Sequence, residues 1–314
     1  MLPPVVKLIR PHQWVKSVFV LFGPLYGLRD LIAQGRDWQQ VLTQALIAAG
    51  VFALASSACY VFNDLRDIER DRVHPRKRNR PLASGAVSPT TGAAMIVLLL
   101  FGAAGLSVLL ESSVRPITVL MVILYVLNTT AYSAGLKNRV IADVISLSLG
   151  FVLRVLGGCF AVGISPSTWL LNCTLFLAMF LAFGKRLGER RTAEAEGYEA
   201  SSARAVQGKY TDNLLRMAVV VTAVAALLTY AGYIQSREHV FNFAAWGVPA
   251  GFNWLWLTTL PALYAMLRSM VLIDRGDYDD PTEMFVKDGP LAIAAALFFS
   301  LSVGVLVMQA NMGS

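Results

Sequence analysis

Long apolar stretches separated by short charged segments recur along the whole of this 314-residue chain. Hydrophobic residues make up 56% of it and charged residues 15%, which is more apolar surface than a water-soluble chain of this length can bury. A helix of about twenty apolar residues crosses the hydrocarbon core of a bilayer. We therefore predict an all-α, polytopic membrane helical bundle in a single integral-membrane domain over 1–314. The nine expected transmembrane helices cover residues 12–30, 41–62, 91–111, 115–134, 140–163, 168–185, 214–234, 252–273 and 290–309.

The basic residues outside these spans fall almost entirely on one side of the predicted bundle. The opposite side holds Arg29, Arg36, Arg115 and Arg237. Because positively charged loops stay in the cytoplasm, we expect a multi-pass protein of the cell inner (plasma) membrane, with its N-terminus and its long charged loops in the cytoplasm. The same rule explains the formal net charge of +7, and no basic and aromatic surface pattern points to nucleic acid as a partner.

The loop after the second span carries an acidic motif that topology does not require. Asp64, Asp67 and Asp71 would share one face if the helix of the span continued into the loop. Three carboxylates this close repel one another unless a cation lies among them, and Mg²⁺ typically binds through a few carboxylates together with substrate phosphates. We therefore predict that these three aspartates are the catalytic residues and that they hold Mg²⁺, with Asn63 as a further oxygen ligand.

Basic residues close to this motif are suited to the phosphate groups of a substrate. Tyr132 and Lys137 taken alone would be an interfacial anchor and a topogenic charge, but both lie at the cytoplasmic end of the fourth span beside the other charged segments. The expected substrate-binding residues of the first four spans and their loops are Lys16, Arg66, Lys77, Arg78, Arg80, Tyr132 and Lys137.

Two further groups of polar residues need an explanation. Lys185, Arg186 and Glu189 end the sixth span, either as a helix end whose ions pair with one another or as a second phosphate-binding edge. Arg154 lies in the middle of the fifth span, where an arginine costs about 2.5–3.5 kcal/mol on insertion scales. Asp143 is on the same helix face, so we expect both residues to line a central polar cavity rather than to form structural ion pairs. The expected substrate-binding residues therefore also include Arg154, Lys185, Arg186 and Glu189.

The motif Asn63-Asp64-x-x-Asp67-x-x-x-Asp71, placed after the second span, resembles that of the UbiA superfamily of intramembrane prenyltransferases. The segment Tyr132-Ser133-x-x-Leu136-Lys137 also fits that family. The resemblance implies a helical bundle around a cytoplasm-facing polar cavity, in which the aspartates bind Mg²⁺ on a diphosphate.

One departure from the usual family pattern points to a particular branch. Most members carry a second aspartate motif after the sixth span, where this chain has Lys185-Arg186-x-x-Glu189. That segment, together with Arg10-Pro11-x-Gln13-Trp14, resembles the decaprenyl-phosphate phosphoribosyltransferase branch. The resemblance implies a Mg²⁺-dependent glycosyltransferase that moves 5-phosphoribosyl from phosphoribosyl diphosphate to a polyprenyl (decaprenyl) phosphate, releasing diphosphate, for the synthesis of cell-envelope polysaccharide precursors.

Two other functions remain open at this stage. A conventional prenyltransferase, which moves a prenyl group from its diphosphate to an aromatic acceptor, would share the fold, the metal and the first motif, but it would need the missing second motif. A membrane transporter would use Asp143 and Arg154 as gating charges. The clustering of charge at one membrane face favours an enzyme over a transporter. The sequence leaves the oligomeric state open, a homo-oligomer included.

Overall fold

The computed structural model describes residues 3–73, 77–195, 206–242, 244, 251–278, 284–285 and 287–312. This part of the chain is almost entirely helical, and the only β pairing within it is an isolated bridge between Asn242 and Asn253. The expected all-α fold is therefore confirmed. The chain divides into two compact units, residues Met1–Pro166 and Ser167–Ser314, and each is described by itself.

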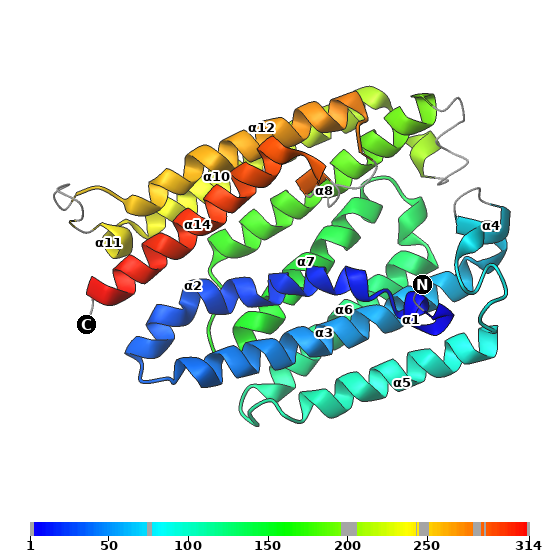
Figure 1. Cartoon of the computed structure of the whole chain (residues 1–314), viewed down its shortest axis with the longest axis horizontal. Helices are drawn as coiled ribbons and strands as arrows, with labels where there is room; N and C mark the ends of the chain where they lie inside the picture. Colours follow the sequence, from blue (N-terminus) through cyan, green and yellow to red (C-terminus); the bar gives the residue numbers. More distant parts are fainter. Residues whose placement is uncertain are drawn as a thin grey trace. The chain divides into compact units, whose positions relative to one another are not determined.

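The first unit holds the N-terminal helices and the acidic motif (Figure 1). Helix α3 contacts α2, α5, α6 and α7, so it is the central element of this unit. The elements are α1 (Pro4–Ile9), η1 (Pro11–Val18), α2 (Phe19–Ala33), α3 (Trp38–Arg66), α4 (Ile68–Val73), η2 (Lys77–Asn79), α5 (Pro89–Ser107), α6 (Arg115–Ala134), η3 (Leu136–Asn138) and α7 (Ala142–Ala161).

The second unit is built around the antiparallel neighbours α8 and α10, and α12 packs on both α8 and α14. Arg268 of α12 donates to both carboxylate oxygens of Asp288, at 3.1 and 2.7 Å, and Asp288 also accepts from the Leu291 amide at the start of α14. The elements are α8 (Thr168–Ala195), η4 (Gln207–Lys209), α10 (Asp212–Ser236), α11 (Glu238–Phe241), η5 (Trp254–Thr258), α12 (Thr259–Arg275) and α14 (Gly289–Met312).

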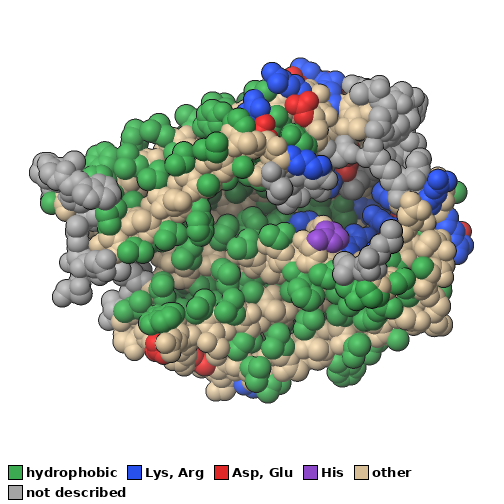
Figure 2. Space-filling view, in the orientation of Figure 1, with side chains coloured by type: hydrophobic (Ala, Val, Ile, Leu, Met, Phe, Trp, Pro, Cys, Tyr) green, Lys and Arg blue, Asp and Glu red, His purple; other side chains and the backbone are tan. Residues whose placement is uncertain are grey.

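Eight helices in the described residues are long and apolar enough to cross a membrane, one for each expected span after the first. The first expected span, 12–30, is divided into the short η1 and the 15-residue α2, which carries Pro24 in its interior. The count of nine therefore stays a prediction. Figure 2 shows hydrophobic side chains over much of the surface, as expected where lipid replaces water. Leu98 and Phe101 of α5 are among these exposed residues.

Short polar residues set where several spans begin. The Asp37 side chain accepts a hydrogen bond from the Gln39 amide at the start of α3. Ser88 accepts from the Thr91 amide and is followed by proline at the first position of α5. These N-caps satisfy amides that have no partner inside the helix, which fixes the ends of the apolar segments.

Glycines of α7 let neighbouring helices approach it closely. A Cβ atom added to Gly158 would overlap the carbonyl oxygen of Val20 in α2, and one added to Gly157 would overlap the ring of Phe52 in α3. The Phe52 ring in turn packs edge-on against Tyr125 of α6, with 5.7 Å between ring centroids. The small residues of α7 thus bring three other helices together around the middle of the first unit.

We expect Gly158→Ala to destabilise the protein by roughly 1–3 kcal/mol, because the added methyl group meets backbone that cannot rotate away. Thermal unfolding in detergent measures this loss. Gly105→Ala is the matched control, since no atom lies within 4 Å of a Cβ added there and alanine is the better helix former by about 1 kcal/mol. Equal melting temperatures for the two variants would contradict the close approach of α2 and α7.

Candidate functional site

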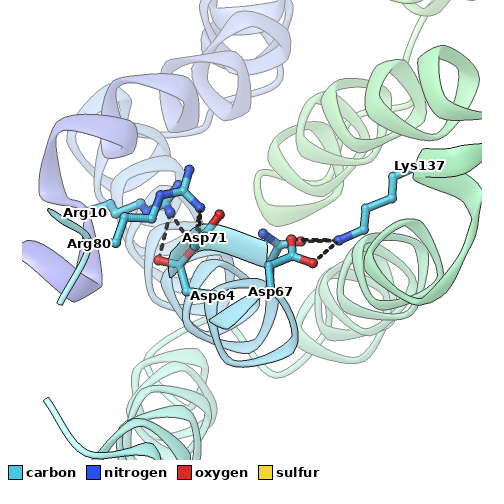
Figure 3. Close-up of polar contacts among 7 residues, drawn as sticks. Arg10, Asp64, Asp67, Asp71, Arg80 and Lys137 are labelled. Carbon is cyan, nitrogen blue, oxygen red and sulfur yellow. Dashed lines mark hydrogen bonds and ion pairs between the residues drawn. The ribbon is translucent and has the colours of Figure 1, made fainter. Parts of the chain in front are cut away.

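Two buried aspartates at the end of α3 and in α4 are held by arginines from distant parts of the first unit (Figure 3). Asp64 and Asp71 are each only 3% exposed. The Arg10 Nη2 atom lies 2.6 and 2.8 Å from the two carboxylate oxygens of Asp64. Arg80 Nη1 bridges the two aspartates, at 3.1 Å from Asp64 and 2.7 Å from Asp71. Because an unpaired buried carboxylate is very costly, these bonds offset much of the cost of burying both side chains.

The third aspartate points to a different partner. Helix α3 ends at Arg66, Asp67 has non-helical backbone angles, and α4 begins at the next residue. The Lys137 Nζ atom lies 2.7 Å from both Asp67 carboxylate oxygens and 3.4 Å from Asn63 Oδ1. Figure 3 shows Asp67 turned toward Lys137 and away from the arginines. The expected continuous helix with one shared aspartate face is therefore wrong in detail, because the helix is interrupted at Asp67.

The acidic site is a set of ion pairs in which every carboxylate is engaged by a basic side chain. Among the described residues, no three His, Cys, Asp or Glu side chains are grouped closely enough to hold a metal ion. The donor set itself, carboxylates with the Asn63 amide oxygen nearby, is the kind that suits a hard divalent cation. A cation could use these oxygens only by exchanging places with the arginines or the lysine.

The other expected residues of the first unit are less closely joined to the aspartates. Arg66 and Arg78 are exposed, and Lys16, Lys77 and Tyr132 are half-buried. In the described part of the chain, Lys16, Arg66 and Arg78 form no ion pair with the acidic motif. Of the expected substrate-binding residues in this unit, the structure brings Arg80 and Lys137 directly onto it.

Arg10 is a site residue that the sequence analysis did not assign. It has the left-handed backbone conformation, φ 56° and ψ 59°, between α1 and η1. Its guanidinium also lies 5.2 Å from the Tyr60 ring centroid, and the Trp14 indole N–H donates to Ser57 at 2.9 Å. These contacts hold the N-terminal segment on α3. The sequence offered one signal for Arg10, which is a basic residue directly before Pro11, the first residue of η1.

His12 adds no charge to this region at neutral pH. Partial burial lowers the pKa of His12 below its usual value, and the nearby Arg10 and Lys16 lower it further. The neutral imidazole therefore avoids repulsion with the two cations.

Arg154 lies inside the first unit, at only 4% exposure. Its Nη2 donates to the Tyr125 hydroxyl at 2.7 Å and its Nη1 to the Gly150 carbonyl at 3.2 Å. The guanidinium stacks 4.5 Å from the Tyr125 ring centroid and 5.5 Å from that of Phe151. No described acidic residue forms an ion pair with it, so the alternative of a structural ion pair is not found. Whether Arg154 and the fully buried Asp143 line a cavity stays a prediction.

In the second unit, Arg186 and Glu189 form an ion pair at 3.5 Å along α8, and Arg186 is only 1% exposed. Gln207, which the sequence analysis missed, donates to Glu189 at 2.8 Å and to the Arg186 carbonyl at 3.1 Å. Lys185 precedes this pair and is half-buried. The helix end thus contains paired ions, as one of the two interpretations expected, and its role in binding phosphate stays a prediction.

A basic network continues beyond this pair. Arg191 and Arg216 both contact Asp212, at 2.9 and 3.2 Å, and Arg216 also reaches Asp274 at 3.1 Å. Asp274 lies in the last turn of α12. Arg190 also lies 4.0 Å from Asp212, so three arginines contact two acids in this network.

We expect Arg80→Ala to destabilise the protein by about 2–3 kcal/mol, because Asp71 loses its ion-pair partner and Asp64 keeps only Arg10. Thermal unfolding in detergent, with and without millimolar Mg²⁺, measures the change. Added Mg²⁺ should raise the melting temperature of the variant more than that of the unchanged protein, since the ion then has a carboxylate available.

Arg72→Ala is the control for this substitution, because Arg72 pairs on the surface with the 84%-exposed Glu69. Such a pair contributes about 0–1 kcal/mol. Equal Mg²⁺ shifts in all three proteins would contradict competition between Arg80 and a divalent ion for the same oxygens.

Comparisons with known proteins agree with this fold. Residues 20–303 match the model of the UbiA prenyltransferase family. The chain is 32% identical to the decaprenyl-phosphate phosphoribosyltransferase of Mycolicibacterium smegmatis, covering 94% of this chain and 92% of that protein. It is 34% identical to the enzyme of the same name from Corynebacterium glutamicum, covering 96% and 87%. A UbiA homologue from Archaeoglobus fulgidus, solved with DMAPP and Mg²⁺, superimposes with a TM-score of 0.64 at 16% identity, covering 96% of this chain and 98% of that one. The chain is thus a multi-pass membrane protein that belongs to the UbiA prenyltransferase family.

Proposed function

We propose that this protein is a Mg²⁺-dependent phosphoribosyltransferase. It transfers 5-phosphoribosyl from phosphoribosyl diphosphate to a polyprenyl (decaprenyl) phosphate and releases diphosphate. The observation that carries the proposal is the acidic site itself, in which Arg10, Arg80 and Lys137 already neutralise three aspartates. The relatives named decaprenyl-phosphate phosphoribosyltransferase, similar over most of their length, support this donor and acceptor.

The carboxylates and the basic side chains of this site have separate tasks. Asp64, Asp67 and Asp71, with Asn63, would hold Mg²⁺, and solved relatives of the fold contain Mg²⁺ with prenyl diphosphates. When bound, the metal supplies charge neutralisation for a leaving diphosphate. Arg80 and Lys137 would move from the carboxylates to the phosphate oxygens, a short displacement for long side chains. Lys16, Arg66, Lys77 and Arg78 are the neighbouring basic residues that we propose to add to this binding.

The transfer itself needs little further chemistry from the protein. The bond between ribose C1 and the diphosphate oxygen breaks, and an oxygen of the lipid phosphate forms a new bond to C1 from the opposite face. The lipid phosphate is already an anion, so no general base has to remove a proton. The task of the basic side chains is to screen the repulsion between the anionic reactants and to hold them in line. Tyr132, which precedes Lys137 in the same segment, would help to place the donor.

The second unit supplies the feature that distinguishes this donor from a prenyl diphosphate. Where a second metal-binding aspartate motif would stand, α8 carries Lys185, Arg186 and Glu189. A sugar donor with an additional phosphate needs more positive charge and fewer metal-binding carboxylates. We propose that Lys185 and Arg186 contribute this charge and that Glu189, held by Gln207, fixes the position of Arg186.

The place of the reaction follows from the chemistry of the two substrates. The charged loops and the N-terminus would face the cytoplasm of a cell with an inner (plasma) membrane, where a water-soluble sugar diphosphate is available. The polyprenyl tail would stay in the bilayer, against the exposed apolar side chains of the spans. The product would serve the synthesis of cell-envelope polysaccharides.

A donor assay separates this proposal from a conventional prenyltransferase, which the family and the diphosphate-bound relatives keep as the second candidate. Purified protein is incubated with labelled phosphoribosyl diphosphate and polyprenyl phosphate, and in parallel with a labelled prenyl diphosphate and an aromatic acceptor. We expect lipid-linked product in the first reaction, dependent on Mg²⁺ and abolished by EDTA. Product in the second reaction alone would overturn the proposal.

We expect Asp67→Asn to lower the turnover number at least about a hundredfold while the protein remains folded, because the amide keeps the shape but loses the charge. Glu69→Gln is the matched control in the same motif, since Glu69 is 84% exposed and lies outside the ion pairs of the site. Its activity should be unchanged. Full activity of Asp67→Asn at saturating Mg²⁺ would contradict the assigned metal ligand, whatever the donor is.

A further inference from the structure

Arg154 carries a positive charge in the interior of the first unit without a negative charge beside it. Among the described residues its Nε–H has no hydrogen-bond partner, and its other contacts are the Tyr125 hydroxyl, a carbonyl and two aromatic rings. An arginine stays protonated in proteins, so burial cannot neutralise it. A desolvated contact with an aromatic face offsets only part of the cost of burying an isolated ion. The Arg154 guanidinium therefore has a positive charge and an Nε–H donor that an anion could use.

A row of polar groups joins Arg154 to the acidic site. Tyr125 and Tyr60 lie close enough to interact electrostatically. The Tyr60 ring lies under Arg10, which holds Asp64. Tyr60 precedes Asp64 by one helical turn, about 6 Å along α3 at 1.5 Å per residue. A series of pairwise contacts thus runs from Arg154 through Tyr125 and Tyr60 to Arg10 and Asp64.

We infer that Arg154, with the hydroxyl groups of Tyr125 and Tyr60, forms a second anion subsite that binds the phosphate monoester of a substrate. The inference rests on the proposed function, because both proposed reactants carry such a group: the donor on its ribose C5 and the lipid acceptor at its end. A guanidinium and two hydroxyl donors match the oxygens of a phosphate. The diphosphate of the donor would bind at the aspartates, about one to two turns nearer the end of α3.

The same residues could instead serve only to join α6 and α7. A structural role predicts that any loss at Arg154 lowers stability and weakens all ligands alike. A subsite predicts a selective loss of the phosphate monoester. Tyr125→Phe is useful here because it removes the hydroxyl while it keeps the ring that packs on Phe52 and Arg154.

Binding to the full chain in detergent distinguishes these roles. The probes are ribose 5-phosphate, a polyprenyl phosphate, and inorganic diphosphate with Mg²⁺. We expect Arg154→Gln and Tyr125→Phe to weaken one phosphate monoester about tenfold or more, the effect of losing a charged hydrogen bond. Binding of Mg²⁺-diphosphate should change less than twofold, which also shows that each variant is folded. Arg154→Lys keeps the charge without the planar donors, so its affinity for the monoester should lie between those of the unchanged protein and Arg154→Gln.

Arg115→Gln is the matched control, because the guanidinium of Arg115, at the start of α6, donates to the carbonyls of Val108 and Leu110, which follow α5. This variant should bind all three probes with the affinity of the unchanged protein. A selective loss of ribose 5-phosphate assigns the subsite to the donor, and a selective loss of polyprenyl phosphate assigns it to the acceptor. Equal loss of all three probes, or no loss of either monoester, overturns the inference.

The outcomes also separate this inference from the proposed function. If the unchanged protein transfers phosphoribosyl but Arg154→Gln binds both monoesters normally, the subsite fails and the function stands. If the unchanged protein uses only a prenyl diphosphate and binds no ribose 5-phosphate, the proposed function fails and the donor subsite fails with it.

Discussion

The ion pairs between the buried aspartates and Arg10, Arg80 and Lys137 organise the functional end of the first unit. Each cation comes from a different segment, and each is drawn to α3 or α4 because an uncompensated buried carboxylate would cost several kcal/mol. These ion pairs act together with apolar packing, since Leu8 of the N-terminal segment and Leu82 and Val87 of the segment after Arg80 are buried in one hydrophobic cluster. The arrangement also means that an incoming cation and an incoming anion must arrive together, since either one alone would leave charge without a partner.

The bundle could be predicted from the sequence because a membrane span is encoded locally. Eight of the expected segments became helices near the expected limits, since about twenty apolar residues leave the backbone no alternative in lipid. The segment 12–30 differed because its charged start belongs to the 3-10 helix η1, and α2 begins only at Phe19. Spacing within one segment likewise revealed the aspartate motif and its basic neighbours.

The geometry of the site could not be predicted, because it depends on partners far away in the sequence. The helix is interrupted at Asp67, and the Asp67 side chain accepts a hydrogen bond from Lys137, 70 residues further along the sequence. Arg10 reaches Asp64 across 54 residues. Gln207 belongs to no motif in the sequence, and only its hydrogen bonds to Arg186 and Glu189 show its role. Motif spacing identifies which groups take part, while tertiary contacts decide which of them are neighbours.

The backbone of Arg10 is strained at the residue whose side chain forms the ion pair with Asp64. A non-glycine residue in the left-handed conformation is strained by roughly 1–2 kcal/mol, and here the strained residue is the one whose side chain is anchored. Release of the carboxylate would let this peptide relax, so part of the energy needed to open the pair is already stored. The segment that follows exposes Trp14, Val15 and Val18. The strained and anchored Arg10 therefore lies shortly before an apolar segment that is partly exposed.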